Sequence, residues 1–181
     1  MKRYILTGAP GSGKTAILRA LERDGYPVVE EAATDVIALR QALGDPEPWT
    51  VPSFLEEIVA LQRHRQERAA AVPGTVHVHD RSPVCTYALA VYLGHPVPPA
   101  LSRELDRVRA HRVYERTVLF VENLGFVTPT EARRITFEDA LRFERVHRDA
   151  YTSLGYDCVP IAPGPLPARV AEVETRLGPW A

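Results

Sequence analysis

Eight consecutive residues near the start of the chain carry the most readable chemistry in the sequence. Gly8, Ala9, Pro10, Gly11, Ser12, Gly13, Lys14 and Thr15 match the phosphate-binding pattern G-x-x-x-x-G-K-S/T at every position. An apolar stretch precedes them and a helical pattern follows, which is the context this pattern requires. Glycines let backbone N–H groups turn toward a phosphate, Lys14 can reach the β- and γ-phosphates, and the Thr15 hydroxyl can coordinate Mg²⁺. The sequence therefore predicts a binding site for ATP or GTP with Mg²⁺.

Charged residues after the third expected strand could complete a phosphotransfer site. Asp80 and Arg81 follow the apolar stretch 75–79, where ATPases of the common type carry an Asp-Glu pair. Asp80 is a candidate Mg²⁺ ligand, but the glutamate that would activate water for hydrolysis is missing from this place. An arginine beside the phosphates suits a second anionic substrate or the charge of a transferring phosphoryl group. The sequence therefore favours a kinase over an ATPase.

An acidic pair follows the second expected strand, 27–29. Ligands of open α/β sheets bind beyond the carboxyl ends of the strands, so Glu30 and Glu31 should face that crevice. We expect Glu31 to act as the base that accepts a hydroxyl proton from the acceptor, with Glu30 pointing away. A solvated acidic pair is the alternative. Glu122, after the stretch 117–121, is the second-ranked candidate for the metal site.

Arg133 and Arg134 lie between the fourth expected strand and a long helical pattern. A lid at about 127–136 could close over the triphosphate, exclude water and bring both guanidinium groups to the transferring phosphate. The pair can equally be a solvated face, because 20 of the 22 basic residues are arginine. Both interpretations stay open.

Short apolar or β-branched stretches alternate with helical periodicity along the chain. The expected strands are 3–7, 27–29, 75–79, 117–121 and 157–161, and the expected helices are 14–23, 33–43, 53–71, 83–93, 100–114 and 136–154. Such alternation predicts a mostly parallel sheet with helices on both faces, a three-layer α/β sandwich. Helix-capping signals are expected from Ser53 with Glu56, from Thr136 with Asp139, and from Ser82 before Pro83.

Composition limits the classes of protein to which the chain can belong. With 45% hydrophobic and 25% charged residues, positions 1–181 are expected to form a single globular domain. The net charge of −1 gives no field that would attract nucleic acid or anionic lipid, so we expect no nucleic acid partner. No apolar run approaches the roughly 18 residues of a membrane span, and the first residues do not read as a secretory leader. We therefore expect a cytoplasmic protein, either a monomer or a homodimer.

Two pairs of residues receive no chemical role. His77 and His79 share one face of an expected strand, but no further histidine at ligand spacing accompanies them, so we expect core residues rather than a metal site. Trp49 and Trp180 lie beside prolines in expected loops.

Segments along nearly the whole chain resemble a known family. These segments are 8–15 (GAPGSGKT), 28–37 (VVEEAATDVI), 80–94 (DRSPVCTYALAVYLG), 118–126 (VLFVENLGF) and 133–161 (RRITFEDALRFERVHRDAYTSLGYDCVPI). Together they are similar to the small bacterial P-loop proteins known as AAA-type predicted ATPases. That group is related to the nicotinamide riboside kinase domain of the bifunctional NAD regulator and, more distantly, to deoxynucleoside kinases.

The resemblance implies a P-loop NTPase fold of the nucleoside and nucleotide kinase type, with a parallel five-stranded sheet in the order 2-3-1-4-5. It implies that residues 8–15 hold the phosphates and Mg²⁺, and that Glu31 matches the family's acid after the second strand. Further matches are Asp80-Arg81-Ser82 for the motif after the third strand, Arg133 and Arg134 for the lid, and Pro163 for a position near the nucleotide base.

Residues and resemblance together lead to one hypothesis and one alternative. We expect transfer of the γ-phosphoryl group of ATP or GTP to a hydroxyl of a small nucleoside-like acceptor, with Thr15 and Asp80 as ligands of Mg²⁺. The residues expected to act in catalysis are Lys14, Glu31, Asp80, Arg81, Arg133 and Arg134. The alternative is a nucleotide-binding regulatory or switch protein with slow NTP hydrolysis.

Overall fold

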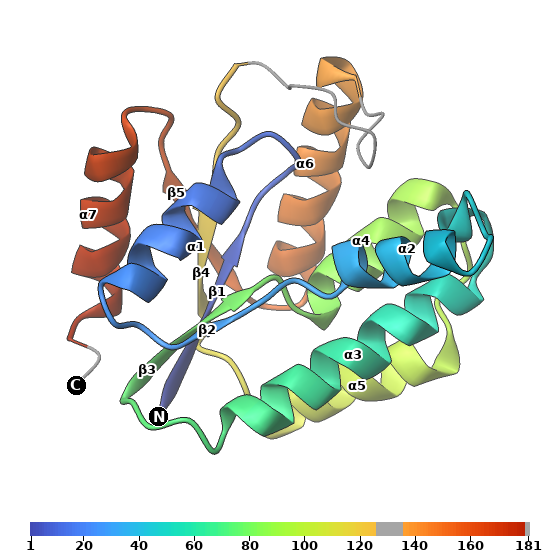
Figure 1. Cartoon of the computed structure of the whole chain (residues 1–181), viewed down its shortest axis with the longest axis horizontal. Coiled ribbons are helices and arrows are strands. Elements are labelled where there is room, and N and C mark those ends of the chain that lie inside the picture. Colours follow the sequence, from blue (N-terminus) through green and yellow to red (C-terminus); the bar gives the residue numbers. More distant parts are fainter. Residues whose placement is uncertain (126–135, 180–181) are drawn as a thin grey trace.

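Within residues 1–125 and 136–179, which the computed structural model describes, five strands form one parallel sheet (Figure 1). The strands are β1 (Lys2–Thr7), β2 (Val28–Val29), β3 (Val76–Asp80), β4 (Thr117–Val121) and β5 (Asp157–Ile161). Each pairing is parallel, and the order in the sheet is β2-β3-β1-β4-β5. This result confirms the expected α/β class and the strand order 2-3-1-4-5.

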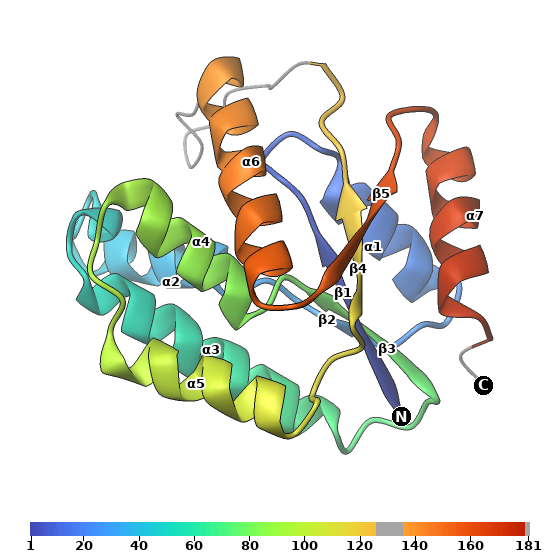
Figure 2. The same ribbon diagram turned by 180° about the vertical axis from the view of Figure 1, so that it is seen from behind.

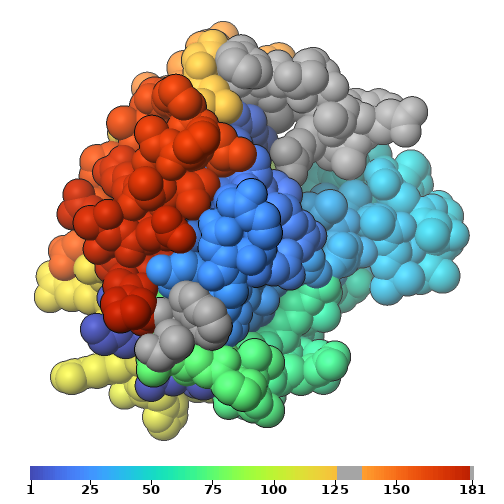
Figure 3. Space-filling model, turned by 60° about the vertical axis from the view of Figure 1, so that its left-hand side comes forward, coloured from blue at the N-terminus to red at the C-terminus, as the bar shows by residue number. Residues whose placement is uncertain are grey.

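Helices cover both faces of the sheet (Figures 1 and 2). The helices are α1 (Lys14–Arg23), α2 (Ala33–Ala42), α3 (Ser53–Ala69), α4 (Pro83–Leu93), α5 (Pro99–Ala110), α6 (Phe137–Ser153) and α7 (Leu166–Leu177), and a 3-10 turn, η1, spans Pro48–Thr50. On one face α1 and α7 lie side by side, as Figure 3 also shows, and α4, α5 and α6 pack on the other. In the part of the chain that is described, no helix is long and apolar enough to cross a bilayer.

The alternation of side chains along β1 separates the two halves of the core. Tyr4 and Leu6 pack with the apolar side of α1 and α7, and Ile5 between them packs with α4, α5 and α6. This division follows from the two-residue period of a strand, since successive side chains point to opposite faces. A third apolar cluster joins α2, η1 and α3 beyond the end of β2. That cluster shapes one wall of the site described below.

Two of the three capping signals are confirmed. The Ser82 hydroxyl accepts a hydrogen bond from the Val84 amide at 3.2 Å at the start of α4, and the Thr136 hydroxyl accepts one from the Asp139 amide at 3.1 Å at the start of α6. The expectation for Ser53 is wrong, because Ser53 already belongs to α3. Pro52, with φ −61° and ψ −27°, starts the helical backbone one residue earlier.

Helix α7 is not predicted from the sequence, because the prolines at 163, 165 and 167 are typical of a loop. Proline is tolerated in the first turn of a helix, where its missing N–H would have no partner in any case. The buried positions 169, 170, 173 and 177 have helical spacing and were the available signal. Helix α5 also ends earlier than expected, at Ala110, because Arg112 adopts a left-handed φ of 46°.

Candidate functional site

The expected phosphate loop connects β1 to α1 at the carboxyl edge of the sheet (Figure 1). Gly13 directly precedes α1 and adopts φ 79°, a left-handed conformation that glycine reaches without strain. Gly8 approaches the neighbouring strand so closely that a Cβ there would collide with the carbonyl oxygen of Val121. Lys14 is buried at the start of α1, and Thr15 beside it is exposed. The loop thus has the shape of a phosphate-binding turn, and it lies at the positive end of the α1 dipole.

Lys14 forms an ion pair with Asp80, the last residue of β3, with 2.6 Å between Nζ and Oδ1. Both side chains are nearly buried, at 6% and 8% exposed. Burial raises the pKa of the Asp80 carboxyl, and the charge of Lys14 opposes that rise. Thr15 and Asp80 line the same small cavity of about 200 Å³. A hydroxyl and a carboxylate, both oxygen donors that Mg²⁺ prefers, therefore lie together, and the two residues fit a Mg²⁺ site.

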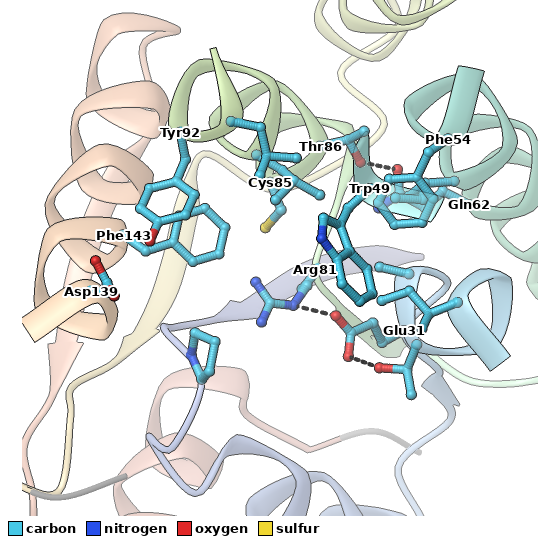
Figure 4. A pocket seen from close by; sticks show the side chains of 17 residues that line it. Glu31, Trp49, Phe54, Gln62, Arg81, Cys85, Thr86, Tyr92, Asp139 and Phe143 are labelled. Carbon is cyan, nitrogen blue, oxygen red and sulfur yellow. Dashed lines mark hydrogen bonds and ion pairs between the residues drawn. The ribbon is translucent and has the colours of Figure 1, made fainter. Parts of the chain in front are cut away.

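Of the acidic pair after β2, Glu31 is the residue directed toward the other site residues. Its Oε1 lies 2.7 Å from Nε of Arg81, and the Thr34 hydroxyl donates to its Oε2 at 3.1 Å (Figure 4). The Glu30 carboxylate instead pairs with Arg19 on the surface, at 2.6 Å. Glu31 is 16% exposed and Glu30 is 54% exposed, so the two carboxylates occupy different environments.

Arg81 adopts a rare backbone conformation between β3 and α4. Its φ of 68° lies in the left-handed region, which residues with a side chain seldom occupy. While its Nε faces Glu31, its Nη1 donates to Nε2 of His147 at 3.1 Å. Nδ1 of His147 donates to the Phe143 carbonyl oxygen at 3.0 Å, so Nε2 carries no proton and can accept. Burial lowers the pKa of His147 to about 3, which keeps this ring neutral. The guanidinium is thus held from two sides.

A larger cavity of about 380 Å³ opens beside Arg81 (Figure 4). Aromatic rings from η1, α3, α4 and α6 contribute to its walls: Trp49, Phe54, Tyr92 and Phe143. Pro10 of the phosphate loop borders the same space. The cavity therefore combines apolar, ring-lined walls with a charged end next to the loop.

Glu31 and Thr34 line both cavities. The smaller cavity contains Thr15 and Asp80, and the larger one contains Arg81 and the aromatic walls. Glu31 therefore lies between the smaller cavity, where the triphosphate and metal are expected, and the larger cavity with its aromatic walls.

The residues of the larger cavity that sequence reasoning missed include Trp49 and Gln62. The sequence predicts no role for Trp49, yet its side chain forms part of the wall of the cavity. Gln62 lies on α3, where its Nε2 donates to the Ser82 carbonyl oxygen at 3.2 Å and its Oε1 accepts from the Thr86 hydroxyl at 3.0 Å. A signal for Gln62 existed, because it continues the four-residue spacing of Phe54 and Ile58 with a polar side chain.

Arg65 was also missed, and it orders the segment that carries Glu31. Its guanidinium on α3 donates to the carbonyl oxygens of Glu30, at 3.2 Å, and of Glu31. It also pairs with the Asp35 carboxylate on α2. No local pattern marks this residue, since its partners lie about 30 positions earlier in the chain.

The remaining sequence candidates lie elsewhere. Pro163 is exposed between β5 and α7, and the Glu122 carboxylate pairs with Arg148 of α6 at 3.2 Å. Arg133 and Arg134, with nearly all of the expected lid at 127–136, lie outside the described residues. Helix α5 contributes no residue to the lining of either cavity among the described residues, and it packs against α3 and α4.

Comparison with protein families gives a match over most of the chain. The family model AAA_28, described as an AAA domain, matches residues 3–169. A search of curated proteins finds no match.

Solved structures with the same fold include two kinds of protein. A NadR protein in complex with NR matches with a TM-score of 0.69 and 16% sequence identity, over 98% of this chain and 51% of that one. NadR with NAD and AMP-PNP matches with a TM-score of 0.64 and 16% identity, over 96% and 49% of the two chains. Deoxyadenosine kinase from M. mycoides with bound dATP matches with a TM-score of 0.57 and 11% identity, over 97% and 98%. The chain thus spans about half the length of the NadR chains, and at these identities the matches show a shared fold.

Proposed function

The chain belongs to the AAA_28 family of AAA domains. We propose that it is a Mg²⁺-dependent phosphotransferase. It moves the γ-phosphoryl group of ATP or GTP to a hydroxyl of a small, nucleoside-like acceptor. The family and the loop at residues 8–15 imply nucleotide binding. Transfer, and the nature of the acceptor, are inferred from the geometry of the site.

The donor half of the reaction uses the residues at the carboxyl edge of the sheet. Backbone N–H groups of the loop bind phosphate oxygens, and Lys14 exchanges Asp80 for the triphosphate. Thr15 and Asp80 are the residues that would hold Mg²⁺, which when bound neutralises charge on the triphosphate. Arg81 lines the larger cavity together with Pro10 of the phosphate loop, and its guanidinium suits the charge that develops on the transferring group.

The position of Glu31 is the single observation that carries the proposal. Its carboxylate lies between the cavity of Thr15 and Asp80 and the ring-lined cavity. A base that accepts the proton of an attacking hydroxyl must reach the acceptor on one side and the phosphoryl group on the other. Arg81 and Thr34 hold the carboxylate in this place, at 2.7 Å and 3.1 Å. The arrangement fits transfer to a second substrate better than hydrolysis by a bound water.

The ring-lined cavity supports an acceptor with a planar ring. Its volume of about 380 Å³ is that of a small-molecule site, and aromatic walls favour stacking against a flat group. Gln62 supplies an amide on one wall, and one of its two N–H groups is used on Ser82. A nucleoside-like molecule has both the ring to stack there and the hydroxyl to approach Glu31. The similar structures of NadR and deoxyadenosine kinase are in complex with NR and with dATP, which supports a nucleoside-like ligand.

The proposal is tested by the release of nucleoside diphosphate from ATP and from GTP with Mg²⁺, against pools of nucleosides, vitamins and sugars. Lys14→Ala serves as the blank, because it removes the cation that reaches the β- and γ-phosphates. The proposal predicts that one pool raises turnover well above the rate without acceptor. Tight nucleotide binding with slow release that no pool stimulates would favour the regulatory or switch function instead.

A further inference from the structure

We propose that Arg169 is a positioning residue of the triphosphate site, holding the phosphate loop in its binding shape from behind. Arg169 lies on α7, far from the loop in sequence, and its side chain is only 4% exposed. Its Nη1 donates to the Ser12 carbonyl oxygen at 2.8 Å. Its Nη2 donates to the Glu122 carbonyl oxygen at 3.3 Å, just past the end of β4. The inference rests on the nucleotide site of the proposed function, and it does not depend on the acceptor.

The bond to Ser12 fixes the direction of a peptide group in the loop. A trans peptide is planar, so the carbonyl oxygen of Ser12 and the N–H of Gly13 point to opposite sides. Because Arg169 holds the oxygen on its own side, the Gly13 N–H points away from α7. In a loop of this type the inward-directed N–H groups bind the phosphate oxygens. Arg169 therefore determines the direction of the Gly13 N–H, which is one donor of the phosphate loop.

Packing places the guanidinium directly behind this peptide. A Cβ added to Gly13 would lie 2.9 Å from Nη1 of Arg169, so glycine leaves the room that the arginine fills. Gly13 also adopts φ 79°, which a larger residue would strain. The left-handed backbone of Gly13 and the close approach of Arg169 thus both depend on the absence of a side chain at this position.

Burial makes the charge of Arg169 relevant to an anionic ligand. Desolvation lowers its pKa, but an arginine guanidinium keeps its charge at neutral pH. Its Nε is buried and has no hydrogen-bond partner among the described residues. The two carbonyl oxygens that it binds are neutral. The Glu172 carboxylate acts on the guanidinium, and the positive charge of Arg169 can also act on a nearby triphosphate. We expect Arg169 to favour phosphate binding through both geometry and charge.

The test is isothermal titration of the full chain with MgATP and with inorganic tripolyphosphate and Mg²⁺. Arg169→Met should weaken both ligands by about ten-fold or more, which is the effect of losing one hydrogen bond to a charged group. Arg169→Lys keeps the charge but has no planar fork for two carbonyl oxygens, so its affinities should lie between those of the wild type and Arg169→Met. Arg176→Met is the matched control, because Arg176 lies on the same helix but is 50% exposed.

Four outcomes would overturn the inference. Wild-type affinity and stoichiometry in Arg169→Met would show that Arg169 has no role in binding. A lower stoichiometry with unchanged affinity would show that it supports folding alone. If Arg169→Met weakens the binding of MgATP but not that of tripolyphosphate, Arg169 acts on the base or ribose rather than on the phosphates. If the wild-type chain binds neither ligand, the nucleotide site itself fails, and this inference fails with it. Failure of every acceptor pool, by contrast, contradicts only the phosphotransferase.

Discussion

At the scale of single residues, the buried charges of the site are held as pairs. Lys14 pairs with Asp80, and Arg81 pairs with Glu31. An unpaired buried charge is costly, so removing one partner of such a pair lowers the stability of the folded protein by about 3–5 kcal/mol. Arg81 has an additional neutral partner in His147, which restrains the guanidinium without neutralising it. The charges are thus held in place while remaining able to exchange partners with a triphosphate.

His147→Gln should weaken the dependence of stability on pH. The pKa of this histidine falls from an ordinary 6.5 to about 3 in the folded protein because the ring is buried. The unfolded chain therefore binds the proton more tightly. The stability from this residue is complete above about pH 6.5 and is lost as the pH falls toward 3, by at most about 1.4 kcal/mol per pH unit. Urea denaturation at about pH 7.5, 6 and 5 measures the slope, which should be shallower in the variant.

The matched control for this prediction is His64→Gln, since His64 is exposed on α3. The neighbouring charges of Arg81, Lys14 and Glu31 act on His147 in the folded protein and are kept in both variants. Asp80, whose pKa is raised, shifts stability in the opposite direction and is also kept. A wild-type slope in His147→Gln would contradict a neutral, buried His147.

At the scale of elements, helix starts position the site. Ser82 caps α4 directly after Arg81, and its hydroxyl is also 2.8 Å from the Tyr151 hydroxyl of α6. The cap therefore ties the segment carrying Arg81 to the helix that carries His147. Thr136 caps α6 in the same manner but on the exposed surface. The two caps differ in burial, so they should differ in their contribution to stability.

Ser82→Ala should cost more free energy of unfolding than Thr136→Ala. Loss of an exposed helix cap costs about 1 kcal/mol. Ser82 is 1% exposed, and its removal also takes a partner from the buried Tyr151 hydroxyl, so we expect about 2 kcal/mol or more. Denaturation by urea, with equal m-values as the check for two-state behaviour, measures both variants. Equal losses would show that the Tyr151 contact contributes nothing.

The elements themselves could largely be predicted from local sequence. Strands β4 and β5 and helices α1 and α4 begin and end at the expected residues. Charged residues, Arg116 and Glu122, flank the apolar stretch of β4, and glycine, proline or a capping residue lies near the ends of the other three elements. The cap of α3 and the existence of α7 were harder to predict, because proline stands directly before both helices, where it is also typical of a loop. The order of strands came from resemblance to a family, since pairing between strands distant in sequence leaves little local trace.

At the scale of the whole molecule, residues far apart in the chain converge on one edge of the sheet. The loop at residues 8–15 was predictable, because its chemistry lies in consecutive residues. The contributions of Trp49, Arg65, His147 and Arg169 were not, because each depends on contacts that only the folded chain creates. The role of Glu31 was predictable in part. The sequence shows that it follows β2, but its position between two cavities is visible only in the structure.

The central claim is that Glu31 joins a phosphate site to an acceptor site, and labelled γ-phosphate tests it most directly. The wild-type chain, Glu31→Gln and Glu30→Gln are incubated with Mg²⁺, γ-labelled nucleotide and the metabolite pools, and the label is followed into phosphorylated metabolites. Glu30 is the matched control, since it is adjacent in sequence but pairs with Arg19 on the surface. We predict a labelled metabolite from the wild type and Glu30→Gln but none from Glu31→Gln, with nearly unchanged nucleotide affinity in all three. Transfer that persists in Glu31→Gln, or label found only in inorganic phosphate for every pool, would contradict the account.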